Sequence, residues 1–75
     1  MSAKMTLAQL REQHHFDIPE IARIAVVGTT DVLHALRGDP ISRATATAIL
    51  KALSRVLRRE YTFDDVEITL KEPSS

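Results

Sequence analysis

Two short helical patterns stand almost end to end in the middle of the chain, and their spacing constrains the fold more than any other feature. The first begins at Asp17, a residue type that favours helix N-termini, and stops just before Gly28. The second runs from Thr29 or Thr30 to Arg37. Both carry apolar residues at helical spacing. We therefore expect two consecutive short helices that cross through a tight turn of about three residues.

A helix is expected on each side of this pair. Thr6 and Gln9 are spaced as a capping box, which predicts a helix that starts there and fades at His14 and His15. After the stop at Asp39-Pro40, Ser42 can cap the longest helix of the chain. Its apolar stripe comprises Ala46, Ile49, Leu50, Leu53, Val56 and Leu57.

The C-terminal tail, residues 62–75, changes from a helical to a strand period. Val66, Ile68 and Leu70 alternate with polar residues, which predicts a short strand. A single strand is not stable in water, so this one either lies against the body of the protein or pairs with another chain. Four helices plus this strand predict an all-α domain that spans residues 1–75.

The composition excludes several classes of protein. The chain has 75 residues and no cysteine, so we expect one domain without disulfides or thiolate zinc sites. No apolar run approaches the roughly 18 residues of a membrane span, and the N-terminus lacks a signal-peptide pattern, so we expect a cytoplasmic protein without membrane contact. The net charge of zero hides a split, with +4 in residues 1–59 and −4 in residues 60–75. A basic body is compatible with a polyanionic partner.

The stretch from Asp17 to Gly38 resembles the helix-turn-helix core of the Xre-type, or Cro/lambda-repressor-like, family of DNA-binding proteins. Ala22 matches the small residue where the two helices cross, and the Arg37-Gly38 pair matches the end of the recognition helix. The likeness extends from about Leu7 to Phe63. It departs from the family pattern at Ile18, where glutamine is usual, and at Val26, where the turn glycine is usual. The resemblance implies a compact four-helix domain whose third helix enters the major groove.

The resemblance also assigns roles to individual residues. Base-edge contacts fall to Thr29, Thr30 and His34, whose side chains can bond to bases or touch a thymine methyl group. Phosphate contacts fall to Arg37 and Arg43, which would supply affinity and register but no sequence information.

Several of these residues have a second interpretation. Thr29 and Thr30 are also good helix caps. Asp31 suits either a cap of the third helix or a contact to a cytosine amino group. Leu33 offers no hydrogen bond, so it contacts a thymine methyl, turns with Leu36 toward the core, or marks a protein-binding surface.

We expect no catalytic site, no metal and no cofactor. The three histidines lie on different predicted elements without acidic residues at ligand spacing. Asp64 and Asp65 have no nucleophile or pocket nearby and suit a solvated turn or helix cap better than acid–base chemistry.

Two functional hypotheses remain. The first is a small transcriptional regulator that binds DNA as a homodimer, with half-sites about 34 Å apart or a multiple of that. Val66, Ile68 and Leu70 would form the two-fold contact, because an alternating strand with an open edge favours a partner. The second is an adaptor or antitoxin-like module that keeps the fold, binds a protein through Leu33 and does not read DNA.

Overall fold

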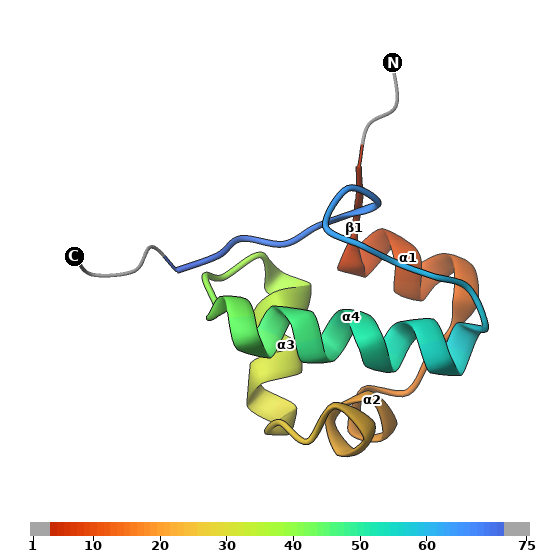
Figure 1. Ribbon diagram of the computed structural model, residues 1–75, viewed down its shortest axis with the longest axis horizontal. Coiled ribbons are helices and arrows are strands. Elements are labelled where there is room, and N and C mark those ends of the chain that lie inside the picture. The colour runs from red at the N-terminus through yellow and green to blue at the C-terminus, as the bar shows by residue number, and fades with distance from the viewer. Residues whose placement is uncertain (1–3, 72–75) are drawn as a thin grey trace.

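The computed structural model describes residues 4–71, which form four helices and a small parallel sheet (Figure 1). In Figure 1, α4 crosses the middle of the view, with α1 above it and α2 below it. The helices are α1 (Leu7–His14), α2 (Ile18–Ala25), α3 (Thr29–Arg37) and α4 (Arg43–Leu57), and the strands are β1 (Met5–Thr6) and β2 (Val66–Glu67). The four expected helices are therefore present.

Local capping determines where α1 and α4 begin. The Gln9 amide donates to the Thr6 hydroxyl at 3.1 Å, and the Thr6 amide donates to the Gln9 side chain at 3.0 Å, which confirms the capping box. The Ser42 hydroxyl accepts from the Thr45 amide at 3.1 Å and caps α4 as expected. Asp17 occupies the cap position of α2, but its carboxylate makes no capping hydrogen bond, contrary to expectation.

The N-terminus of α3 is capped as one of the sequence interpretations expected, and the other interpretation does not hold. Gly28 occupies the N-cap position, and its amide donates to the Asp31 carboxylate at 3.2 Å. The interpretation of Asp31 as a cap is therefore confirmed. The interpretation of Thr29 and Thr30 as caps is wrong, because both already lie inside the helix and leave the cap position to glycine.

The core lies between the helices, and α4 makes its most extensive contacts with α2. Ile49 and Leu53 on α4 are completely buried, as is Ile21 on α2. Each helix presents apolar residues to this core and polar residues to solvent, so burial of the apolar faces stabilises the arrangement. No helix in the described part of the chain is long and apolar enough to cross a membrane.

Residues 62–71 of the tail lie against the body of their own chain. Only Val66–Glu67 of the expected strand is a strand here, and it pairs in parallel with β1, an element that was not expected. Further along, Leu70 forms an isolated parallel bridge with Ile41. Figure 1 shows the tail running past β1 and on toward the segment between α3 and α4.

Candidate nucleic-acid interface

One side of α3 packs into the protein and the other faces solvent. Val32 and Ala35 belong to the core, while Thr30, Leu33 and Arg37 are exposed. These two sets lie on opposite sides of the helix because successive residues are 100° apart. The sequence therefore builds α3 as a helix propped on α2 and α4 with an outward face.

Thr29 and Thr30 lie at the solvent-exposed N-terminal end of this helix. Neither hydroxyl is used in a hydrogen bond within residues 4–71, so both keep their donor and acceptor capacity for a ligand. The structure thus places these two predicted contact residues together and outside the core.

His34 is half-buried and has a partner that the sequence analysis missed. Its Nδ1 lies 3.0 Å from a carboxylate oxygen of Asp39, and the same oxygen lies 3.8 Å from Nε of Arg37. Asp39 therefore holds the imidazole ring in one orientation and partly offsets the charge of the arginine. These contacts couple a predicted base-contact residue to a predicted phosphate-contact residue.

The end of α3 explains how Asp39 reaches these side chains. Gly38 adopts the left-handed conformation with φ of 85°, and the Asp39 amide then donates to the His34 carbonyl at 2.9 Å. This arrangement folds the residue after glycine back over the last helical turn. An acidic residue directly after a C-terminal helix glycine is therefore the sequence signal for this contact.

Arg43, the second predicted phosphate contact, is the first residue of α4 and is exposed. Its guanidinium carbon lies 5.4 Å from the centre of the Phe63 ring, within the range of a cation–π contact. The ring restricts the arginine side chain while the guanidinium keeps its hydrogen-bond donors for a ligand.

A hollow beside α3 brings together residues from three segments. The Ser42 hydroxyl, which lines this hollow, donates to the Thr45 hydroxyl at 2.8 Å. No group of three or more potential metal ligands occurs within residues 4–71. The hollow is lined by Thr30, Asp31, His34, Asp39, Pro40, Ile41, Ser42, Thr45 and Lys71.

Two large apolar side chains among the described residues face solvent. Leu33 is 42% exposed, and Val26, in the turn before α3, is 88% exposed. Leu36, in contrast, is half-buried and packs against the core. The helical register thus separates the two leucines, and Leu33 remains on the outward face.

The three residues expected at a two-fold contact are buried to different degrees. Val66 is only 1% exposed and belongs to the core of its own chain. Ile68 and Leu70 are half-buried and pack against the same core. The Val66 side chain is therefore engaged within the chain and does not face a partner.

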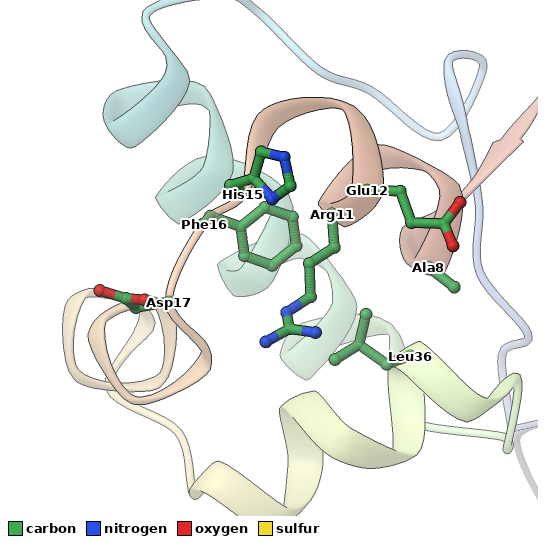
Figure 2. A pocket seen from close by; sticks show the side chains of 7 residues that line it. All are labelled: Ala8, Arg11, Glu12, His15, Phe16, Asp17 and Leu36. Carbon is green, nitrogen blue, oxygen red and sulfur yellow. The ribbon is translucent and has the colours of Figure 1, made fainter.

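A second hollow, shown in Figure 2, lies between α1, the start of α2 and α3. Arg11 extends into it from α1, and Leu36 lines it from α3. The Glu12 carboxylate points away from the Arg11 guanidinium in this view. Arg11 is therefore an accessible cation to which the sequence analysis gave no role.

Comparison of the chain with family models, with curated proteins and with solved structures gave no match.

Proposed function

We propose that this protein is a sequence-specific DNA-binding protein that uses α2 and α3 as a helix-turn-helix, with α3 in the major groove. The observation that carries the proposal is the outward face of α3, where Thr30, Leu33 and Arg37 are exposed while Val32 and Ala35 hold the helix on the core. The connection between the two helices, Val26–Gly28, has the length of this motif.

The side chains around this face suit both kinds of DNA contact. Thr29 and Thr30 present free hydroxyl and methyl groups, and Leu33 offers an apolar surface to a thymine methyl. Arg37 and Arg43 supply cations for phosphates. His34, oriented by Asp39, offers its other ring nitrogen to a base edge.

The test is selection of bound sequences from random double-stranded DNA, followed by titrations at two salt concentrations. We expect one preferred sequence whose affinity falls by about 0.9 log units per log unit of salt for each phosphate contacted. Arg43→Ala should weaken all sequences alike and reduce this slope, whereas Thr30→Ala should change the preferred sequence. Lys51→Ala, an exposed change on α4, serves as the matched control.

Absence of DNA binding at low salt would contradict the proposal. Unchanged binding by both the Arg43→Ala and the Thr30→Ala proteins would contradict the contact assignment while leaving DNA binding in place.

The exposed Leu33 and Val26 favour a second candidate function, a protein-interaction module that keeps the fold without reading DNA. Both are large apolar side chains in contact with water, and a protein partner that covered them would remove that apolar surface from solvent. If the protein binds no DNA, Leu33→Asp tests this second function. The substitution should abolish binding to a protein partner, because it places a charge on the apolar contact surface.

A further inference from the structure

One edge of the segment 65–71 is hydrogen-bonded to its own chain. The Met5 amide donates to the Asp65 carbonyl at 3.1 Å. Further along, the Ile41 amide donates to the Thr69 carbonyl at 3.0 Å, and the Lys71 amide donates to the Ile41 carbonyl at 2.7 Å. Residues 65, 69 and 71 therefore direct their backbone groups toward the body of the protein.

The opposite edge of this segment is open. In extended backbone, the N–H and C=O groups of alternate residues point to opposite edges, so those of Ile68 and Leu70 point away from β1 and Ile41. No hydrogen bond within residues 4–71 uses the backbone groups of either residue. At the near end, the Val66 amide is already bonded to the Thr62 carbonyl at 3.1 Å. The usable edge therefore runs from Ile68 to Leu70.

We propose that a second copy of this chain pairs with this edge as an antiparallel strand, with the two-fold axis at Thr69. In this register Ile68 of each copy lies opposite Leu70 of the other, and four hydrogen bonds form between backbone groups that have no partner within residues 4–71. The contact closes on itself, because the same patch serves on both sides.

The exposed side chains on this strand select the register and the partner. With the axis at Thr69, Glu67 of each copy lies opposite Lys71 of the other, which gives two Glu–Lys pairs. The two Thr69 residues lie opposite each other. Opposite charges and threonine pairs at directly opposed positions stabilise antiparallel strands. An axis at Glu67 would instead oppose two glutamates and would require the Val66 amide, which is occupied. The charge pattern is thus complementary to itself.

The role of the three predicted dimerisation residues changes accordingly. Ile68 and Leu70 contribute through their backbone groups, while their side chains pack on the core of their own chain. Val66 contributes no contact across the axis. This inference does not depend on DNA binding, because a single domain can present α3 whether or not its tail pairs.

The experiment is sedimentation velocity of the full chain over a range of concentrations at low salt, with charge-reversed variants. Glu67→Lys and Lys71→Glu each place two like-charged pairs across the axis, and each should raise the dimer dissociation constant about tenfold. The double variant restores both opposite pairs and should dimerise like the original protein. Both residues are exposed, so the fold should survive these changes.

Mixing the two single variants provides a second readout that a change in folding cannot imitate. One copy then carries two lysines and the other two glutamates at these positions, so the mixture should form a heterodimer that neither variant forms alone. Glu60→Lys, an exposed charge reversal outside the segment, is the matched control and should have no effect. A chain that stays monomeric at all concentrations, or a dimer that neither single variant weakens, overturns the proposal.

Discussion

At the scale of single residues, Val26 adopts a backbone conformation that its own side chain disfavours. It ends α2 in the left-handed conformation with φ of 59°, where a β-branched side chain is strained. Its side chain is almost fully exposed, so packing does not offset the strain. The tight turn between α2 and α3 imposes this conformation, and at Gly38 the same conformation is accepted by a residue without a side chain.

We predict that Val26→Gly stabilises the protein. Removal of the side chain relieves a strain of about 1–2 kcal/mol, and the added freedom of glycine in the unfolded chain offsets part of it, so the free energy of unfolding should rise by about 0.5–1 kcal/mol. Urea denaturation measures the change. Val27→Gly is the control and should destabilise, because Val27 is half-buried against the core. A Val26→Gly protein less stable than the original would refute the strain argument.

At the scale of elements, the end of α4 and the tail are joined by one side chain. The Ser54 hydroxyl donates to the Leu50 carbonyl at 2.8 Å and accepts from the Tyr61 amide at 2.9 Å. Tyr61 is itself buried, so this serine directs the chain from α4 back over the core. Residues 65–71 then reach β1 and Ile41, and no hydrogen bond within the described residues uses the backbone groups of Ile68 or Leu70.

We predict that Ser54→Ala loosens this connection. The Tyr61 amide loses its acceptor in a partly buried position, which should lower the free energy of unfolding by about 1–2 kcal/mol. Hydrogen exchange should show faster exchange of the Tyr61 amide and of β2. Lys51→Ala, one turn earlier on the exposed side of α4, should leave the Tyr61 amide and the amides of β2 protected. If these amides exchange equally slowly in the original and the Ser54→Ala proteins, the Ser54 hydroxyl does not anchor the tail.

At the scale of the whole molecule, the two ends of the described chain depend on each other. Met5 pairs with Val66, and the Val66 side chain completes the core beneath the sheet. A domain of this size has a small core and a low free energy of unfolding. The loss of one core side chain therefore removes a large fraction of that free energy. Deletion of the tail after Asp65 would therefore disturb folding as well as association, which is why charge reversal is the better test of pairing.

We predict that Val66→Ala lowers the free energy of unfolding by about 2 kcal/mol, because it removes buried methyl groups and leaves a cavity. For a domain of this size the melting temperature should fall by about 10 °C, as circular dichroism can measure. Asp64→Ala, at an exposed position two residues earlier, should change the melting temperature far less. Similar melting of the Val66→Ala and original proteins would show that the tail is not part of the cooperative unit.

Much of the helical architecture was predictable because it depends on short-range chemistry. The capping box at Thr6, the serine cap of α4 and the left-handed glycine at Gly38 each join groups within about four residues. The contact of Asp39 with His34 was within reach of the same reasoning, since it follows from the glycine that ends α3. The exposed face of α3 followed from the apolar residues on its other side.

The sequence by itself determined where the helices begin and end and which of their faces is apolar, because those properties depend on neighbours along the chain. Only the tertiary structure decided that β1 exists and which edge of residues 65–71 the body of the protein covers. Those outcomes depend on contacts between residues far apart in sequence, such as Met5 with Asp65 and Ile41 with Thr69. Such contacts form only when the core brings the segments together, and the alternating pattern of residues 65–71 does not indicate which edge the core will cover.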